Sequence, residues 1–115
     1  IINIASVEAL TPGLGLGIYS TSKAAILMLS KNQAKEWGKY GVRVNAICPG
    51  LIKTKFSAAL WQNEKILEKI QKSIPSGRMG DPEEIVGLAC LLASNAGAYM
   101  TGGVYTADGG YMIAG

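Results

Sequence analysis

The segment Tyr19-Ser-Thr-Ser-Lys23 contains the side chains of this sequence that are best spaced to act together in a reaction. If these residues open a helix, a spacing of four puts the Tyr19 phenol and the Lys23 ammonium on one face, within reach of one small molecule. A fixed cation beside a phenol stabilises the phenolate, so the phenol becomes usable as an acid or a base. The same spacing also suits a ring at an interface and a solvated charge, so the chemical interpretation needs support from other segments.

Two apolar runs on either side of this segment give that support. Residues 1–5 read as a buried strand that ends at Ser6, and residues 42–47 read as a second one that ends in the turn Cys48-Pro-Gly50. A strand, a helix and a second buried strand form a βαβ unit, which is right-handed almost without exception. Ser6 and the turn are therefore expected at the carboxyl edge of one sheet, where open α/β folds bind ligands.

Four motifs follow one another along the chain. They are Asn3-Ile-Ala-Ser6, Tyr19-Ser-Thr-Ser-Lys23, Arg43-Val-Asn-Ala-Ile-Cys-Pro-Gly-Leu-Ile-Lys-Thr54 and Asp108-Gly-Gly110. In order and spacing this set resembles the short-chain dehydrogenase/reductase family, and most closely its glucose dehydrogenase, carbonyl reductase and 3-oxoacyl carrier-protein reductase type. The resemblance implies an α/β fold, the C-terminal half of a Rossmann-like doubly wound parallel sheet in three layers.

The resemblance also implies an activity and its residues. The protein would be an NAD(P)-dependent oxidoreductase that transfers a hydride between the cofactor and a secondary alcohol or ketone. Tyr19 would be the proton donor or acceptor, Ser6 would add a second hydrogen bond to the substrate oxygen, and Lys23 would hold the phenolate and bind the nicotinamide ribose. No metal is required.

The turn after the second strand carries the remaining implied contacts to NAD or NADP. Pro49 and Gly50 bend the chain, the backbone of Ile52 would meet the nicotinamide carboxamide, and the hydroxyl of Thr54 would bond carboxamide or phosphate. Thr54 is also a good helix N-cap residue, and both roles can hold together.

Two loops are candidates for substrate contact. The glycines between residues 13 and 17 lack the spacing of a dinucleotide loop, so we interpret residues 7–18 as a flexible apolar loop beside the substrate. Leu14 and Leu16 would contact substrate there or cover the core. In the resembled family residues 55–73 form a lid over the substrate, which makes Leu60 and Trp61 weaker candidates.

The helix from Tyr19 to Trp37 is apolar all round in its first half, so it must be covered on more than one side. One side is the sheet. The other side would be covered by a second subunit, as in the family's dimers and tetramers, or by another part of the same protein. The resemblance implies a homodimer or homotetramer formed through this helix and the C-terminal strand, residues 104–107.

Residues 1–115 hold only three candidate strands, few for a sheet covered on both faces. We therefore expect residues 1–115 to be the C-terminal half of a single NAD(P)-binding Rossmann domain, whose glycine-rich loop, NAD-or-NADP-selecting residue and active-site asparagine lie upstream. The segment alone is expected to be inactive, so the proposed activity belongs to the whole protein. A catalytically silent nucleotide-binding or scaffolding homologue and a truncated remnant are the alternatives.

Composition narrows the possible partners. The net charge of +3 comes from scattered basic residues, whereas nucleic-acid binding needs a basic patch, so no nucleic acid is expected. No apolar run is long enough for a bilayer, so no membrane is expected either. Cys48 and Cys90 read as buried free thiols, which suits the cytoplasm. The sequence has no histidine, which argues against common metal centres.

Downstream, residues 55–73 are expected to form one or two short helices, and a further helix follows. They span residues 56–61 and 63–72, with a Glu68–Lys72 ion pair, and residues 81–94, where Asp81 caps the helix and Glu84 completes a capping box.

Overall fold

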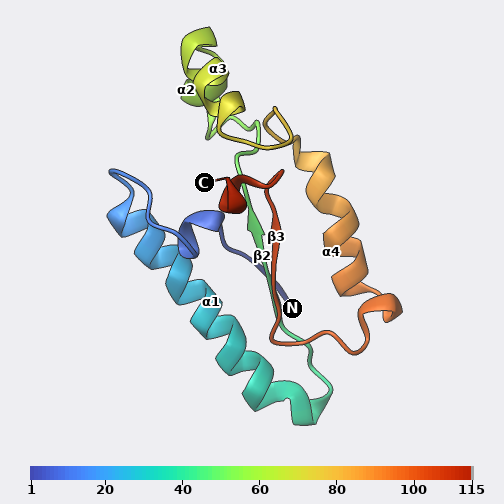
Figure 1. Ribbon diagram of the computed structural model, residues 1–115. Coiled ribbons are helices and arrows are strands. Elements are labelled where there is room, and N and C mark those ends of the chain that lie inside the picture. The colour runs from blue at the N-terminus through green and yellow to red at the C-terminus, as the bar shows by residue number, and fades with distance from the viewer. Residues whose placement is uncertain (115) are drawn as a thin grey trace.

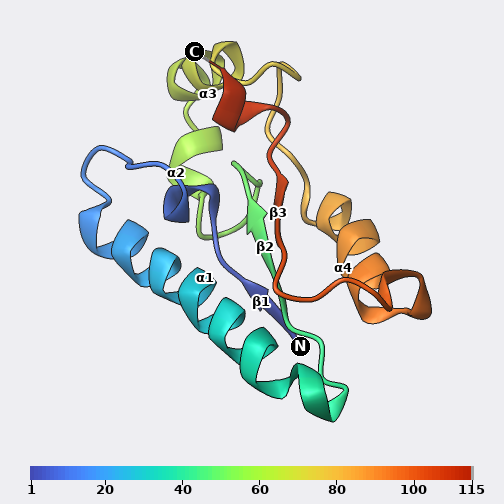
Figure 2. The same cartoon turned by 60° about the horizontal axis from the view of Figure 1, so that its bottom comes forward.

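A computed structural model of the chain describes residues 1–114, whose centre is a three-stranded parallel sheet. The strands are β1 (Ile2–Ile4), β2 (Asn45–Pro49) and β3 (Val104–Ala107), in the order β1-β2-β3 (Figures 1 and 2). Ile4 pairs with Ile47, and Cys48 pairs with Thr106. The predicted parallel α/β sheet is confirmed.

Helices cover both faces of this sheet. Figures 1 and 2 show α1 (Gly17–Trp37) and α4 (Val86–Ala93) on opposite sides of the strands. Two short helices, α2 (Ala58–Trp61) and α3 (Glu64–Lys72), lie beyond the carboxyl ends of the strands. Among residues 1–114, no helix combines the length and the apolar character needed to cross a membrane.

The two crossover connections have opposite hands. Both connections step in the same direction across the sheet, from β1 to β2 and from β2 to β3, yet α1 and α4 cover opposite faces. One crossover must therefore depart from the right-handed rule. This arrangement leaves β2 covered on both faces, and Val44 through Cys48 are all buried.

The core forms where α1 crosses the sheet. Ala5, Leu27, Ala46 and Cys48 make one buried cluster, with Val104 among the half-buried side chains around it. Small residues at positions 5 and 46 let α1 approach the strands closely. Met79 and Leu92 are buried elsewhere in the structure.

Several element boundaries differ from the sequence prediction. The second strand begins at Asn45 rather than residue 42, because the Val44 amide bonds the hydroxyl of Thr101 instead of a neighbouring strand. The helix predicted over residues 81–94 is a 3-10 turn, Pro82–Ile85, followed by α4. The prediction that both cysteines are buried is wrong for Cys90, which lies on the outward side of α4, whereas Cys48 is buried.

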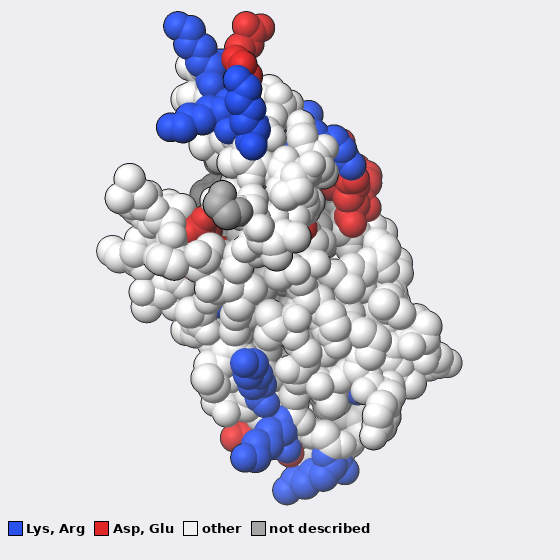
Figure 3. All heavy atoms as spheres, in the orientation of Figure 1, with Lys and Arg blue, Asp and Glu red and all other residues white. Residues whose placement is uncertain are grey.

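Charged side chains gather away from the middle of the visible surface. Figure 3 shows Lys and Arg over α3 and at the far end of α1, with few charges between. On α3 the lysines alternate with carboxylates, and Lys72 bonds Glu68 at 2.7 Å, as predicted.

Asn45 is a buried polar residue that joins β2 to the segment leading into β3. Its Nδ2 donates to the carbonyl of Met100 at 2.7 Å, and its Oδ1 accepts from the amide of Gly103 at 3.1 Å. One side chain thus satisfies two backbone groups of the segment that leads into β3.

Replacing Asn45 with Leu in the full-length protein should lower the free energy of unfolding by about 2 to 4 kcal/mol, since each unpaired buried backbone group costs roughly 1 to 3 kcal/mol. Denaturant titration measures the change. Asn32→Leu, at an exposed position of α1, is the matched control and should alter stability by less than about 0.5 kcal/mol. Equal effects of the two variants would contradict the bridging role of Asn45.

Candidate active site

Ser6 lies directly after β1, at the carboxyl edge of the sheet. Its backbone is extended and its side chain is almost fully buried, with 8% exposed. The hydroxyl oxygen accepts from the amide of Glu8 at 3.2 Å and so caps the 3-10 turn Val7–Ala9. The hydroxyl hydrogen is free to rotate toward a ligand.

Tyr19 and Lys23 lie in the first turns of α1 and face the same way. The Lys23 ammonium is 5.7 Å from the centroid of the Tyr19 ring, as the spacing of four predicts. Lys23 also donates to the carbonyl of Ile4 at 3.2 Å, and Ile4 is the last residue of β1. This bond ties the start of α1 to the strand that carries Ser6, so the three candidate catalytic residues belong to one connected unit.

Cys48 packs under the Ser6 turn. Burial raises the pKa of the Cys48 thiol, and a hydrogen bond from the backbone of Ser6 opposes part of that rise. A thiol held protonated is a poor nucleophile, so Cys48 is a structural residue that supports the turn.

The turn after β2 is pressed against the end of β3. A Cβ built at Gly50 would lie 2.6 Å from the Cα of Asp108, so only glycine fits there. Beyond it, Ile52 forms a parallel bridge with Gly80, in which the Lys53 amide bonds the Gly80 carbonyl at 2.8 Å. Pro49 and Gly50 are half-buried. The proposed cofactor turn is thus fixed by backbone contacts on two sides.

Thr54 is held by a hydrogen-bonded turn that ends at Ser57. The Ser57 hydroxyl donates to the carbonyl of Ile52 at 2.6 Å and accepts from the amide of Thr54 at 2.9 Å. The Thr54 hydroxyl accepts from the amide of Ser57 at 3.3 Å, so Thr54 caps this turn while remaining exposed. Because of this turn, the helix predicted from residue 56 begins only at Ala58. The sequence analysis missed Ser57, although the reciprocal Thr-x-x-Ser spacing is a turn signal.

The segment after Thr54 carries aromatic side chains toward Tyr19. The Phe56 ring stacks on the Tyr19 ring with centroids 6.4 Å apart and 26° between the planes, although Phe56 is 88% exposed. Trp61 donates its indole N–H to the Thr54 carbonyl at 3.0 Å, which anchors the ring. Phe56 is a candidate substrate contact that the sequence analysis did not single out.

The four predicted substrate contacts divide into two groups. Leu60 and Trp61 are half-buried in the segment that carries Phe56. Leu14 is fully exposed and Leu16 is exposed at 41%, both in the loop that precedes α1.

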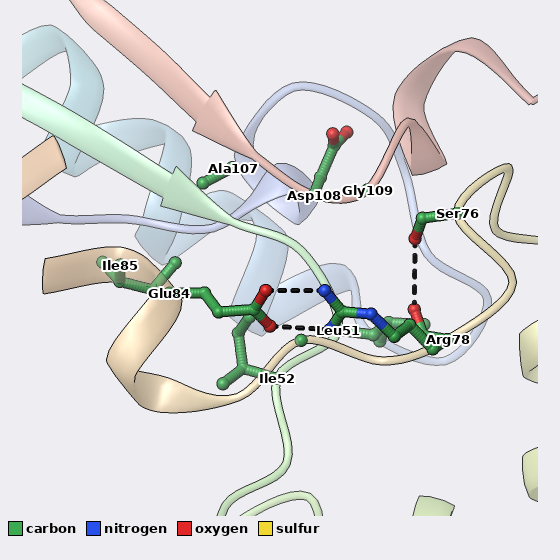
Figure 4. Close-up of a pocket in the computed structure, with 10 residues that line it drawn as sticks. Leu51, Ile52, Ser76, Arg78, Glu84, Ile85, Ala107, Asp108 and Gly109 are labelled. Carbon is green, nitrogen blue, oxygen red and sulfur yellow. Dashed lines mark hydrogen bonds and ion pairs between the residues drawn. The ribbon is translucent and has the colours of Figure 1, made fainter. Parts of the chain in front are cut away.

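A separate hollow of about 220 Å³ lies behind the turn that follows β2 (Figure 4). The Arg78 guanidinium makes two bonds to the Glu84 carboxylate, of 2.7 and 2.6 Å, and the amide of Asp81 donates to the same carboxylate at 2.9 Å. The bonds from Arg78, and then that from Asp81, hold the pKa of Glu84 at about 2. None of Ser6, Tyr19 or Lys23 lines this hollow, so we assign it a structural role.

The polar groups at the sheet edge fit a nucleotide better than a metal. An ammonium has three donors, of which Lys23 uses one on Ile4, and the exposed Thr54 hydroxyl is a further polar group. These groups suit ribose hydroxyls and amide or phosphate oxygens. Residues 1–114 contain no cluster of three metal-ligating side chains.

Comparisons with known proteins agree on one family. The profile described as Enoyl-(Acyl carrier protein) reductase matches residues 1–112. The rabbit (Oryctolagus cuniculus) protein "Dehydrogenase/reductase SDR family member 4" is 41% identical over 110 residues, covering 96% of this chain and 42% of its own length. The chain spans less than half the length of these curated relatives.

Comparison with solved structures agrees with these sequence comparisons. A gluconate 5-dehydrogenase from Burkholderia cenocepacia, in complex with NADP and tartrate, is 33% identical with a TM-score of 0.96, covering all of this chain and 45% of the other. A 4-hydroxyisoleucine dehydrogenase complexed with NADH is 34% identical with a TM-score of 0.95, covering 98% of this chain and 46% of the other.

Replacing Ser57 with Ala in the full-length protein should free the Thr54 segment. Loss of a hydrogen bond worth about 0.5 to 1.5 kcal/mol predicts a two- to tenfold faster hydrogen exchange of the Thr54 amide. Ser57→Thr should restore slow exchange. Ser73→Ala, which removes a different serine-to-carbonyl bond at the end of α3, is the control. Unchanged exchange at Thr54 in Ser57→Ala would show that the turn is held by other contacts.

Replacing Glu84 with Gln should flatten the acid dependence of stability in the full-length protein. Because the folded-state pKa of about 2 lies below the usual 4.5, this carboxylate stabilises the fold above about pH 4.5 and loses that effect as pH falls toward 2. Unfolding measured at several pH values between 4.5 and 2 should show a smaller slope for Glu84→Gln. The neighbouring exposed Glu83→Gln is the control, and an equal slope in both variants would contradict the ion pair's role.

Proposed function

The chain belongs to the short-chain dehydrogenase/reductase family, and from that premise we propose that the protein containing it is an NAD(P)-dependent oxidoreductase acting on a secondary alcohol or ketone. One observation carries the proposal: the Lys23 ammonium lies 5.7 Å from the Tyr19 ring and is bonded to the strand that ends at Ser6. The relatives named as dehydrogenases and reductases support it.

In this proposal Tyr19 is the proton donor in reduction and the proton acceptor in oxidation. When a ketone is reduced, negative charge develops on its oxygen, and the Tyr19 hydroxyl donates a proton to that atom. In the oxidation direction the phenolate takes the proton back. Lys23 places a positive charge near the Tyr19 ring, and the bond to Ile4 fixes the position of that charge.

Ser6 stabilises the same oxygen. Its hydroxyl already accepts the Glu8 amide, so its hydrogen points elsewhere and is available to the substrate oxygen. A donor fixed before the reaction stabilises charge as the charge forms, at no reorganisation cost. Burial of Ser6 excludes water from that bond.

A bound nicotinamide cofactor, NAD or NADP, would supply or accept the hydride. Lys23 would hold its ribose, and Pro49, Gly50, Ile52 and Thr54 would form the turn against its carboxamide and phosphates. The Ile52 carbonyl is taken by Ser57, which leaves the Ile52 amide as the group for the carboxamide. Solved relatives that contain NADP or NADH support the choice of cofactor.

We further propose that residues 1–115 form the C-terminal half of one NAD(P)-binding domain, a view supported by the partial coverage of every relative reported above. Met28 and Leu29 are exposed on α1, which supports a homodimer or homotetramer contact through this helix and β3. Two free cysteines support a reducing compartment such as the cytoplasm.

The decisive variant is Tyr19→Phe in the full-length protein. Because the proton donor is lost while the ring remains, turnover of a reducible ketone should fall by about 10²- to 10⁴-fold. NAD(P)H should still bind, as measured by the change in its fluorescence. Tyr40→Phe, at a tyrosine exposed at 71%, is the matched control and should leave turnover unchanged.

Retained turnover in Tyr19→Phe would remove Tyr19 from the acid role. Cofactor binding without turnover of any ketone by the unaltered protein would instead favour the silent homologue.

A further inference from the structure

The Phe56 side chain is 88% exposed, yet its ring stacks on the ring of the proposed proton donor. The centroids of Phe56 and Tyr19 are 6.4 Å apart, which lies within the range of about 4.5 to 7 Å that attractive aromatic pairs prefer. An apolar ring with so little of its surface buried adds little to the core. The contact with Tyr19 is therefore the feature of Phe56 that needs a functional explanation.

The backbone on both sides of Phe56 is held in place. The Thr54 amide donates to the Ser57 hydroxyl at 2.9 Å, and the Ser57 amide donates to the Thr54 hydroxyl at 3.3 Å. The indole N–H of Trp61 adds a bond to the Thr54 carbonyl at 3.0 Å. Since Phe56 lies between the two residues that bond each other, a fixed turn presents its ring to Tyr19.

The Tyr19 ring has less support of its own. It is half-buried in the first turn of α1, and within residues 1–114 no hydrogen bond fixes its hydroxyl, although its backbone carbonyl accepts from Ser22. A tyrosine side chain turns about two bonds, so the direction of the phenol depends on what packs against the ring. The Lys23 ammonium is a single point 5.7 Å from the centroid, whereas the Phe56 ring is a flat surface that restricts rotation.

The direction of the phenol matters for the proposed chemistry. A proton donor must lie within hydrogen-bond reach of the atom that receives the proton. Misplacing a reacting group by about 1 Å can slow an enzyme by about a hundredfold. A ring that is already held before the ketone arrives keeps more of the protein ready to react.

We infer that Phe56 is a positioning residue for the proposed reaction, and that its ring holds Tyr19 in the direction from which the proton is transferred. The inference rests on the proposed oxidoreductase function. This role differs from a substrate contact, because it acts through Tyr19 and is the same for every ketone. Since Thr54 belongs to the proposed cofactor turn, one short segment serves both the cofactor and the phenol.

The test follows hydride transfer in a single turnover of the full-length protein, with NADPH or NADH fluorescence as the signal and 2-butanone and 2-octanone as the ketones. Phe56→Ala should lower the rate about three- to tenfold, by the same factor for both ketones, since an aromatic pair is lost. Phe56→Tyr should keep the rate because its ring can stack in the same way, whereas Phe56→Leu should not. Tyr40→Ala, which removes an exposed ring just beyond α1, is the control and should leave the rate unchanged. Because Phe56 is exposed, its variants should remain folded, which denaturant titration checks.

A double-mutant cycle shows whether Phe56 acts through Tyr19. Tyr19→Phe keeps the ring but lacks the proton donor, so adding Phe56→Ala should lower the residual rate by less than about 1.5-fold. The full loss in that background would overturn the inference. A loss that appears in KM, or that is larger for 2-octanone than for 2-butanone, would make Phe56 a substrate contact and would also overturn it.

A second measurement requires no turnover, so it separates this inference from the proposed function. In NMR spectra of the full-length protein with isotope-labelled tyrosine rings, the Tyr19 signals are identified by their loss in Tyr19→Phe. Phe56→Ala should shift these signals, because the ring current of the stacked neighbour is removed, and should leave the Tyr40 signals in place. If no ketone is reduced but the Tyr19 signals move, the oxidoreductase proposal fails while the hold of Phe56 on Tyr19 remains. Unmoved Tyr19 signals reject the inference whatever the activity.

Discussion

Parallel pairing between β1 and β2 is the constraint on which the candidate site depends. Because the strands run in the same direction, Ser6 and the turn at Gly50 emerge at the same edge of the sheet, and α1 must return along the sheet to connect them. The Lys23 bond to Ile4 then fixes the start of α1 to that edge. The Lys23 ammonium, on the same helix as the Tyr19 phenol, is thereby held beside the strand that ends just before Ser6.

Polar side chains that bond backbone groups hold irregular segments at both ends of the strands. Asn45 satisfies the loop before β3, and Ser57 satisfies the turn that contains Thr54. In each case a side chain pairs backbone groups of an irregular segment, which helps to keep that segment ordered.

Sequence patterns predicted the sheet, its helices and the shared face of Tyr19 and Lys23, because apolar runs and a spacing of four are local signals. They did not predict Asn45, Ser57 or the stacking of Phe56 on Tyr19, because these depend on partners brought close by the fold. The exposure of Cys90 was missed because α4 is apolar on nearly every side, so composition does not reveal which face points outward. The opposite hands of the two crossovers also lay outside local pattern, since only the packed helices reveal them.

The close approach of Gly50 to Asp108 has a practical consequence for exchanging parts between relatives. With the Gly50 turn and the backbone at Asp108 in contact, neither segment can be re-shaped alone. A chimera that grafts residues 49–57 from another protein must import the stretch from 107 to 112 as well, or its new turn will meet the wrong neighbour. The two segments, more than fifty positions apart, behave as a single transplantable module.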